Sequence, residues 1–412
     1  MQGKERFRWF LGWLGVAVLV LLGYWLRGRT QPTAAQLPVH ETTRTVAPEI
    51  WAPRQVVTPP PPANGAEKQI DICGFGKVSL PADDDFATYE FLAPKTRRAA
   101  ERWQSALLGS DNYRARAAGL FLEGKIARGT SVEPMTEQTR DALAQLAAGA
   151  QDPAVYALAL YACGRGNENP ALSACAQLSP DGWARLDPDN AEPWLMLVGK
   201  ARQANDTDAE AYAFAQAAKA HRDDSYNDSL LAFSESLLPG DVTPLERWYF
   251  ATQVFGVTAA FVQPYQPTSK HCSDEAMRDG AVRQQCSDLA ELMVTKGTTT
   301  IDFAIGMRLG SRAGWPAQKV KALTQQFEAM LQTVGQVAGI DQDQPWSCSS
   351  VQRGNAYASL VTRLGEVGAA REAVERSGES VPELAQKWQE YVDKVHRDDQ
   401  QRHAASPEVS AP

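Results

Sequence analysis

Histidine is scarce in this chain, with five residues among 412. Three of them, His40, His396 and His403, lie in a proline-rich segment or near the charged C-terminal end. Histidine-assisted catalysis is therefore left with His221 and His271. The chain also lacks a Gly-x-Ser-x-Gly motif, the turn that presents the nucleophilic serine of α/β-hydrolases. These absences argue against a hydrolase that pairs a nucleophile with histidine.

Metal and nucleotide motifs are incomplete, and no Cys-x-x-Cys pair is present. Residues 119–125 have the glycine and lysine spacing of a phosphate-binding loop, but Ile126 stands where that loop needs a hydroxyl for magnesium. Asp341 and Asp343 begin like a calcium loop, yet Gln352 replaces its bidentate glutamate. The sequence therefore predicts no catalytic, cofactor-binding or metal-binding residues.

Positive charge is scarce beyond the N-terminal end. The chain has 41 Lys and Arg residues against 49 Asp and Glu residues, a formal net charge of −8. Residues 1–29 contribute +4, so the rest of the chain carries −12. Nucleic-acid binding depends on clustered basic side chains, so this acidic remainder excludes nucleic acid as the expected partner.

One apolar segment is long enough to span a membrane. Residues 9–26 form an uncharged run of 18 residues, which as a helix covers about 27 Å, close to the hydrocarbon thickness. More basic side chains precede the run than follow it, which favours a cytoplasmic N-terminus at residues 1–8. We therefore predict a single-pass inner-membrane protein with an uncleaved signal anchor and a body in the periplasm or another extracytoplasmic space. A cleaved signal peptide and the inverse topology are the alternatives.

All six cysteines follow that run, and their even number suits disulfides in an oxidising compartment. Four of them form two pairs that are close in sequence and suit bridges between neighbouring helices: Cys163 with Cys175, and Cys272 with Cys286. Cys73 and Cys348 remain, and a bond between them would join the start of the body to its C-terminal third. Six cysteines allow fifteen pairings, and buried free thiols in a cytosolic protein are the alternative.

Composition divides the rest of the chain into segments. Residues 27–68 are rich in proline, with a run of four at 59–62, and predict an extended stalk. Residues 69–93 begin with alternating apolar and polar residues, which predicts a short extended segment. From 94 to 397 the pattern becomes helical, and residues 398–412 are predicted to be a disordered tail.

Apolar residues recur at steps of three and four through the body, which predicts amphipathic helices. One such stripe includes Leu323, Phe327 and Leu331. Similar helical segments are expected at 95–108, 111–128, 134–150, 153–163, 191–204, 207–221, 225–237, 243–261, 280–296 and 351–364. Because strands are almost absent, we predict an all-α body, either a layered helical bundle or an irregular solenoid of stacked helix pairs.

Residues 186–220 favour the solenoid. Trp194 and Leu197 fall on a first helix, Asn205 and Asp206 form a turn, and small residues follow on a second helix. These small residues are Ala211, Ala215 and Ala218. The segment resembles a tetratricopeptide repeat, which implies that two helices pack as a pair through these side chains. Flanking segments show no clean period of about 34 residues, so only one repeat is identified.

These features suggest three functions. The first is a non-enzymatic, membrane-anchored envelope protein whose helical body binds a protein or peptide partner. The second is an envelope enzyme, of a type that hydrolyses cell-wall polymer, with catalytic carboxylates that no motif reveals. The third is an adaptor that faces the cytosol. Two carboxylates facing one cleft would favour the second, and six accessible reduced thiols would favour the third.

Overall fold

The computed structural model describes residues 67–81, 87–123, 135–164, 174–259, 265–338 and 344–405. The chain divides into two units, residues 1–64 and 65–412, and every described residue belongs to the second. The predicted cytoplasmic N-terminus, the predicted span at 9–26 and the stalk up to residue 66 lie outside the described residues. Among the helices that are described, none combines the length and the apolar character that a membrane crossing needs.

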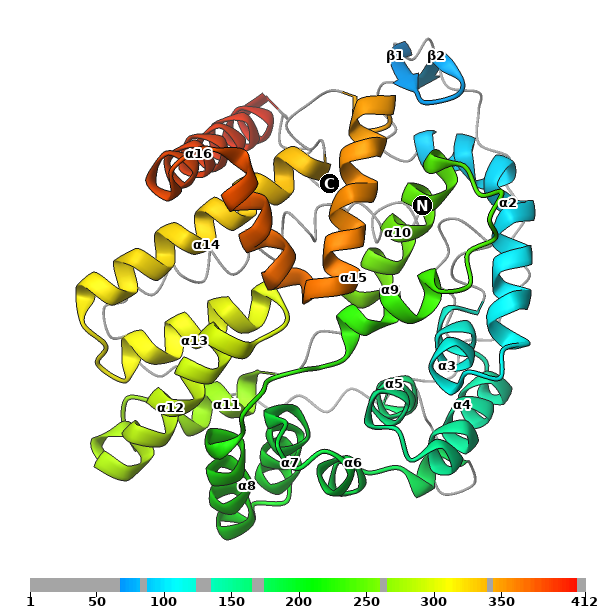
Figure 1. The fold of residues 1–412 in the computed structure, drawn as a ribbon. Coiled ribbons are helices and arrows are strands. Elements are labelled where there is room, and N and C mark those ends of the chain that lie inside the picture. The colour runs from blue at the N-terminus through cyan, green and yellow to red at the C-terminus, as the bar shows by residue number, and fades with distance from the viewer. Residues whose placement is uncertain are drawn as a thin grey trace, which may run out of the picture. The chain divides into compact units, whose positions relative to one another are not determined.

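The described residues form one β-hairpin, fifteen α-helices and two short 3-10 helices (Figure 1). The hairpin consists of β1 (Glu67–Ile72) and β2 (Gly76–Pro81). The helices are α2 (Ala87–Leu108), α3 (Tyr113–Leu122), α4 (Glu137–Ala150), α5 (Pro153–Cys163), η2 (Ala174–Gln177), α6 (Pro180–Leu186), α7 (Ala191–Gln203), α8 (Thr207–Lys219), α9 (Asn227–Glu235), α10 (Pro244–Ala259), α11 (Gln266–His271), η3 (Ala276–Arg278), α12 (Gly280–Lys296), α13 (Thr300–Arg312), α14 (Ala317–Ala338), α15 (Cys348–Ser377) and α16 (Val381–Ala405). The prediction of a mainly α-helical body is confirmed.

The hairpin replaces the single extended segment that the sequence predicts. β1 and β2 pair antiparallel, and the chain reverses at residues 73–75. Gly74 has a φ of +83° there, a conformation that glycine adopts without a steric penalty. Ile70, Ile72 and Leu80 alternate with polar residues and are buried against the helices. The alternation of apolar and polar residues therefore identifies which side chains are buried. The turn places these side chains on two paired strands instead of one extended segment.

The ends of the helical region differ from their predicted positions. α2 begins at Ala87, inside the segment 69–93 that the sequence pattern predicts to be extended. Pro94 lies within this helix, where it provides no N–H for a helical hydrogen bond, but buried neighbours such as Leu92 fix the helix in the core. At the other end, α16 continues to Ala405, into the predicted tail. The last residues, 406–412, lie outside the described ones.

Contacts between the helices run in a closed circuit. Each helix from α2 to α8 contacts the next, and so does each helix from α12 to α15. α8 contacts α12, which joins the two series. α9 and α10 contact α15 on one side and α3 and α2, respectively, on the other (Figure 1). Contacts between helices that are far apart in the sequence, such as α3 with α9 and α10 with α15, therefore close the circuit.

Buried apolar residues form three clusters. The first core combines the hairpin with α2 to α5, α9, α10 and part of α15. The second core is formed mainly by α7, α8 and α12. The third is smaller and contains Phe303, Met330 and Val367, from α13, α14 and α15. In the first core, α5 buries every residue after Pro153, and its alanines allow neighbouring helices to approach closely.

All six cysteines form disulfides. Two of the bonds are local and link Cys163 with Cys175 and Cys272 with Cys286. The third links Cys73 to Cys348, across a sequence separation of 275 residues. It joins the turn of the hairpin to the first residue of α15, and the Cys73 N–H also donates to the Trp346 carbonyl at 2.9 Å. The start and the C-terminal third of the body are therefore covalently connected.

Candidate functional site

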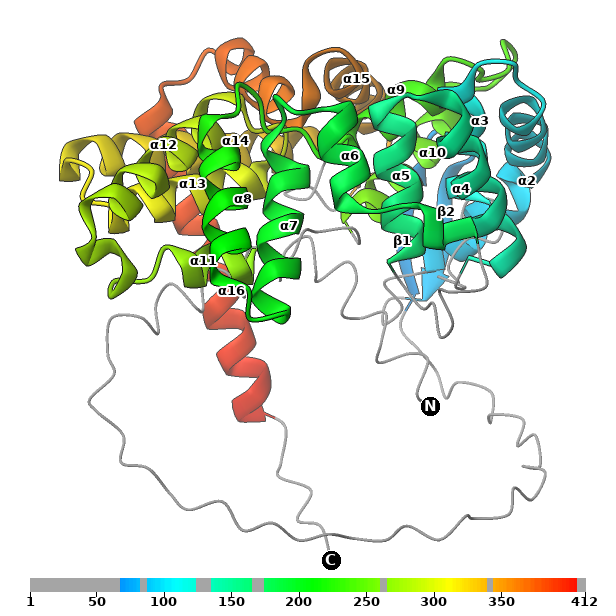
Figure 2. The same ribbon diagram turned by 90° about the horizontal axis from the view of Figure 1, so that it is seen from below.

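The helix pair α7 and α8 occupies the segment that resembles a tetratricopeptide repeat. The two helices lie side by side and are joined by a short turn at residues 204–206 (Figure 2). Trp194 and Leu197 of α7 are half-buried and pack against the second core, as does Ala218 of α8. The side chain of Asp206 caps the start of α8. A helix pair therefore lies where the resemblance implies one.

The buried side of α8 differs from the one that the resemblance implies. Ala211 is exposed and Ala215 is half-buried, whereas Ala213, Phe214 and Ala217 are buried in the second core. Phe214 is the bulkiest apolar side chain on the inner side of this helix. Burial of Phe214 together with Ala213 and Ala217 centres the inner side of α8 on these residues, which leaves Ala211 beyond its edge and exposed.

An aromatic pair projects from these two helices. The rings of Trp194 and Tyr212 lie 6.1 Å apart in an edge-on arrangement. Tyr212 is 61% exposed, more than any other large apolar side chain of the described residues. The indole N–H of Trp194 donates to the Pro188 carbonyl at 2.9 Å, which fixes the orientation of that ring. An exposed aromatic ring held against a fixed one is a suitable anchor for a protein partner.

The two histidines left as catalytic candidates have different surroundings. His271 stacks on Phe214, with ring centres 4.0 Å apart, and its Nδ1 lies 2.9 Å from a carboxylate oxygen of Glu210. Arg202 approaches the second oxygen of Glu210 at 3.5 Å. The His221 side chain is 84% exposed. His271 thus belongs to a half-buried group with Glu210 and Arg202, and the structure does not bring His221 to it.

The segment that connects α8 to α9, residues 220–226, is the α8–α9 link. It runs between the start of α7 and the turn before α13, and it is bridged to both. Asn190 pairs with Arg222 on one side, and Asp223 pairs with Gly297 on the other. A Cβ at Gly297 would collide with the Met293 carbonyl oxygen and lie 2.8 Å from the Cβ of Asp302, so glycine permits the tight turn between α12 and α13.

Three carboxyl groups from three segments are fully buried around the link, and we call them the inner acid group: Glu192, Asp223 and Asp302. Their residues are 1%, 0% and 1% exposed, respectively. Neither oxygen of Glu192 or of Asp223 has a hydrogen-bond partner among the described residues. Asp302 differs, because it accepts hydrogen bonds from the Tyr265 hydroxyl and from the N–H and hydroxyl of Thr299.

Burial changes the acidity of this group. Desolvation raises the pKa of each of the three carboxyl groups, and the charges of neighbouring acids raise the pKa of Glu192 and Asp223 further. The hydrogen bonds from Tyr265 and Thr299 act in the opposite direction and lower the pKa of Asp302 in part. The inner acid group therefore retains protons at pH values where exposed carboxyl groups are ionised.

A second pair of acids lies beside the first group. The Asp228 carboxylate accepts a hydrogen bond from the Glu366 N–H at 2.7 Å. The Glu366 carboxylate accepts hydrogen bonds from the hydroxyl of Thr300 at 2.5 Å and from its N–H at 3.3 Å. Burial raises the pKa of both carboxyl groups, and the Glu366 charge raises that of Asp228 further. Gly365, with a φ of +72°, kinks α15 and so frees the N–H groups of Glu366 and Val367 for partners outside the helix.

Three helix N-termini meet at these acids. Glu192, Asp228 and Asp302 lie in the first turns of α7, α9 and α13. A helix N-terminus has unpaired N–H groups and a partial positive charge, which stabilises a nearby carboxylate. This effect offsets part of the desolvation without an ion pair. We call the inner acid group together with Asp228 and Glu366 the acidic junction.

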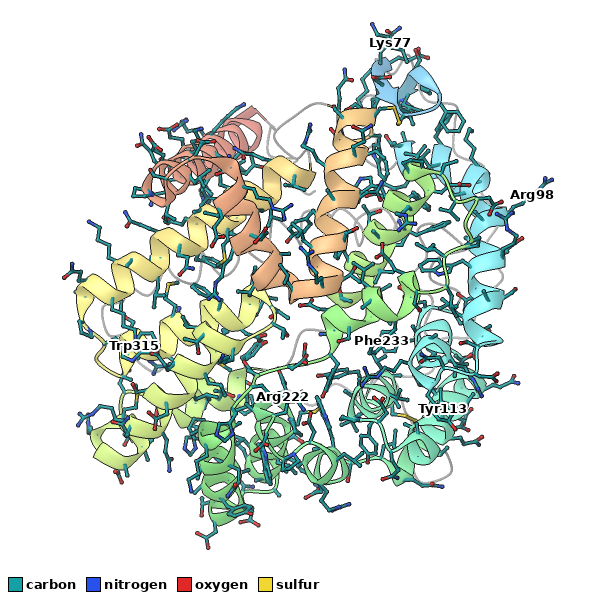
Figure 3. All side chains as sticks on the ribbon, viewed as in Figure 1. Lys77, Arg98, Tyr113, Arg222, Phe233 and Trp315 are labelled. Atoms are coloured by element: carbon teal, nitrogen blue, oxygen red, sulfur yellow. A yellow bond between two sulfur atoms is a disulfide. The ribbon has the colours of Figure 1, made fainter. Side chains whose placement is uncertain are left out.

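Arg222 provides a positive charge at the edge of the acidic junction (Figure 3). It forms an ion pair with Asp187, and its Nη1 donates to the Tyr226 hydroxyl at 2.9 Å. It also lies 3.9 Å from a carboxylate oxygen of Asp224. Arg222 is therefore paired with the outer acids, Asp187 and Asp224. The inner acid group forms no ion pair with a described basic residue.

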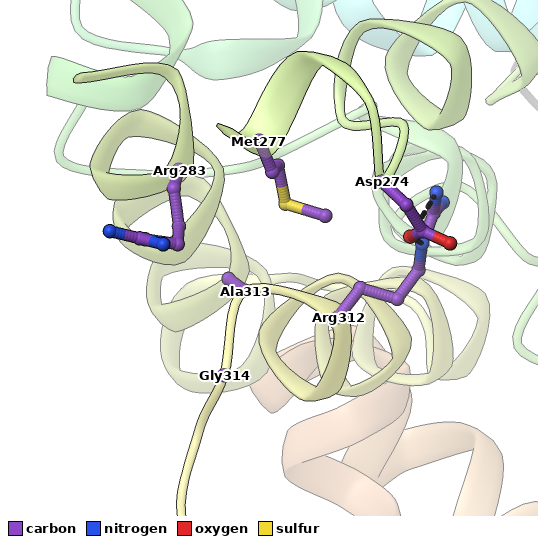
Figure 4. A pocket seen from close by; sticks show the side chains of 6 residues that line it. All are labelled: Asp274, Met277, Arg283, Arg312, Ala313 and Gly314. Atoms are coloured by element: carbon purple, nitrogen blue, oxygen red, sulfur yellow. Dashed lines mark hydrogen bonds and ion pairs between the residues drawn. The ribbon is translucent and has the colours of Figure 1, made fainter. Parts of the chain in front are cut away.

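A depression of about 470 Å³ lies elsewhere, on the surface where η3 approaches the end of α13 (Figure 4). It is lined by Asp274, Met277, Arg283, Arg312, Ala313 and Gly314. Arg312 and Asp274 form an ion pair at 3.0 Å within it, and the Arg283 side chain stands on the opposite side of Met277. Its one carboxylate is thus already paired with a basic side chain.

Sequence reasoning missed the acidic junction. Thr299 and Asp302 have the spacing of a capping box, and the structure contains that box. Glu192 and Asp228, in the first turns of their helices, equally resemble ordinary exposed acids. Because positions 192, 223 and 302 are far apart in the chain, no local pattern indicates that they meet. The motif-like starts at Asp341 and Asp343 lie outside the described residues, as does residue 126.

No family model, curated protein or solved structure matches the chain.

Proposed function

We propose that the chain is a membrane-anchored binding protein whose disulfide-bonded helical body lies outside the cytoplasm and engages a protein or peptide partner through α7 and α8. The observation that carries this proposal is the pairing of exposed Tyr212 with the fixed ring of Trp194. Aromatic side chains dominate the energetics of protein interfaces, and a ring held in place loses little conformational freedom on binding.

The disulfides support the extracytoplasmic location. All six cysteines are paired, and disulfides persist in oxidising compartments but are rare in the cytosol. The apolar run at 9–26 supplies the proposed anchor, and the proline-rich stalk after it would hold the body away from the bilayer. Together these features favour the exported orientation over a cytosolic adaptor.

Two carboxylates that face one cleft would favour the envelope-enzyme alternative. The depression on the surface has one carboxylate, Asp274, which is paired with Arg312. The carboxyl groups that do gather, in the inner acid group, are 0 to 1% exposed. Partner binding therefore has a specific supporting observation, and cell-wall hydrolysis has none among the described residues.

Site-specific photocrosslinking in cells tests the binding surface. A photoreactive phenylalanine at position 212 is expected to form a discrete protein adduct, because this side chain is exposed beside Trp194. Tyr113 is a matched control, since it is 50% exposed on α3. The substitution Tyr212→Ala is expected to weaken the captured partner's binding about 10- to 100-fold, as for an interface anchor, and Tyr113→Ala is expected to leave it unchanged. Equal adducts at both positions would contradict the assigned surface.

Thiol labelling tests the compartment. In intact cells, the exported body is expected to react with a thiol reagent only after reduction, because all six cysteines are paired. Six thiols that react without a reductant would refute the exported orientation.

A further inference from the structure

The inner acid group connects elements of different cores. Glu192 lies on α7, which packs in the second core, and Asp302 lies on α13, which contributes Phe303 to the third. The link that carries Asp223 continues into α9, whose Leu230 belongs to the first core. The three carboxyl groups are therefore located where the three cores meet.

Hydrogen bonds hold the link more densely to the start of α7 than to the turn before α13. The Ala191 N–H donates to the Arg222 carbonyl at 2.9 Å, and the N–H groups of His221 and Arg222 donate to the Asp189 carbonyl at 3.0 Å and 3.2 Å. The Asn190 side chain also bonds to both the N–H and the carbonyl of Asp224. On the other side, the contact is the single bridge from Asp223 to the turn before α13. The buried carboxyl groups therefore lie beside the weaker of the two attachments, where their charge state can decide whether the link stays in contact with that turn.

Acids face the inner acid group from each neighbouring element that acts on it. Asp224 lies beside it in the link, and the Tyr265 hydroxyl contacts Asp302. Asp228 and Glu366 approach from α9 and α15. The basic residue nearby, Arg222, is paired with outer acids. If Glu192, Asp223 and Asp302 were all ionised, three like charges would be buried without an ion pair, which is strongly unfavourable.

We propose that the inner acid group is a protonation-dependent joint between the three cores, closed while it holds at least one proton and loosened when that proton passes to solvent at higher pH. Loss of the last proton leaves Glu192, Asp223 and Asp302 as three buried like charges, and separation of the link from the turn before α13 admits the water that would hydrate them. The inference does not depend on the proposed partner binding.

The direction of the pH effect follows from the raised pKa of the buried groups. Each carboxyl group holds its proton more firmly in the folded body than in the unfolded chain, where the pKa is near 4. Stability from these groups is therefore fully present below the unfolded pKa and is lost as pH rises through the folded pKa. Between the unfolded pKa and the folded pKa, the unfolding constant rises about tenfold per pH unit for each proton that the folded state holds in excess.

Hydrogen exchange followed by mass spectrometry tests the joint in the purified full-length chain in detergent. After correction for the intrinsic pH dependence of exchange, peptides that cover residues 220–228 and 296–300 are expected to lose protection about tenfold or more between pH 6 and pH 8. The double variant Glu192→Gln with Asp223→Asn keeps the shape of both side chains and removes their charge. Its loss of protection between the two pH values is expected to be much smaller than that of the wild type, because only Asp302 of the inner acid group still titrates. Asp241→Asn is the control, because Asp241 is an acid with a 71% exposed side chain.

Three results would overturn the proposal. One is constant protection of the wild-type link across this pH range, and another is an equal pH response in the double variant. The third is protection of the wild type at pH 8 by added calcium or magnesium that is absent in the double variant, since the charge would then be balanced by a metal ion. If the double variant does not fold, the single variant Glu192→Gln provides the same comparison, with about half of the pH response expected to remain.

Discussion

The first core and the acidic junction are both buried, but their chemistry differs. In the first core, α5 buries every residue from Ala154 to Cys163, and none of these side chains is charged. At the junction, Glu192, Asp223 and Asp302 are equally buried, and two of them have no hydrogen-bond partner among the described residues. Burial stabilises the first region through apolar area, whereas in the second it penalises ionisation. Changes in pH are therefore expected to act on this protein at the junction rather than throughout the body.

The long-range disulfide is expected to have the largest effect on the first core. Replacing Cys73 and Cys348 with serine opens a loop with a sequence separation of 275 residues. The unfolding free energy is expected to fall by about 5 kcal/mol in the loop-entropy description, because the unfolded chain gains freedom. Urea unfolding of the oxidised protein measures this loss.

The short-loop bond between Cys163 and Cys175 is the matched control for that experiment, with a sequence separation of 12 residues. Its removal is expected to cost about 3 kcal/mol. A larger loss for the short loop than for the long one would show that local strain, and not loop closure, determines these contributions.

Removal of a central side chain from the first core is expected to have the next largest effect. Trp103 is 1% exposed, stacks on Phe250, and donates its indole N–H to the Ser234 carbonyl at 2.7 Å. Trp103→Ala is expected to lower the unfolding free energy by about 4 kcal/mol, equally at pH 6 and pH 8, because no titrating group is involved. Trp194→Ala, at a half-buried position, should cost less than half as much in the same urea titrations.

A change at the junction is expected to be smaller and to depend on pH. Tyr265→Phe removes the hydroxyl that donates to Asp302, and this hydrogen bond lowers the pKa of that carboxyl group. Without it, the folded pKa of Asp302 rises further above its unfolded value. The added loss of stability is therefore absent below about pH 4 and complete above the folded pKa, at about 2 kcal/mol.

Urea titrations between pH 5 and pH 8 measure this difference. Tyr113→Phe is the control, because Tyr113 is half exposed on α3. An equal loss of stability at pH 5 and pH 8 for Tyr265→Phe would mean that the hydroxyl contributes through packing alone.

The smallest effect is expected at the surface. Arg102 and Asp241 form an ion pair at 2.9 Å, with both side chains more than half exposed. Asp241→Asn is expected to change the unfolding free energy by less than about 0.5 kcal/mol at any pH from 5 to 8, because solvent screens such pairs. A loss comparable to that of Tyr265→Phe would remove the distinction between surface and junction charges.

Local sequence patterns predicted most of the helices. The stripe through Leu323 and Phe327 lies in α14, and both side chains pack against the third core. The periodic segment 153–163 coincides with α5. The start of α2 was harder to predict, because Pro94 is a helix breaker by itself and is tolerated only in the context of a packed helix. Helix periodicity is a local property, while the tolerance of proline depends on tertiary contacts.

The helix pair α7 and α8 and the acidic junction differ in the same respect, because local patterns predict part of the first and none of the second. The positions of Trp194 and of the turn after α7 can be predicted from residue spacing along one helix pair. Which side of α8 is buried, with Phe214 inside and Ala211 exposed, depends on the helices that pack against it. Glu192 and Asp302 have the sequence context of first-turn acids, which are usually solvated. Nothing in that context indicates that the α8–α9 link covers them.

Composition and periods of a few residues are enough to predict a helical body, an acidic charge and cysteines suited to bridges, including a bond between Cys73 and Cys348 as one of fifteen pairings. The fold selects that pairing, and it alone brings carboxyl groups from positions 192, 223 and 302 into one dry interior. The physical reason is that the cost of burying a charge depends on which segments exclude water from it, and those segments come from three separate parts of the chain.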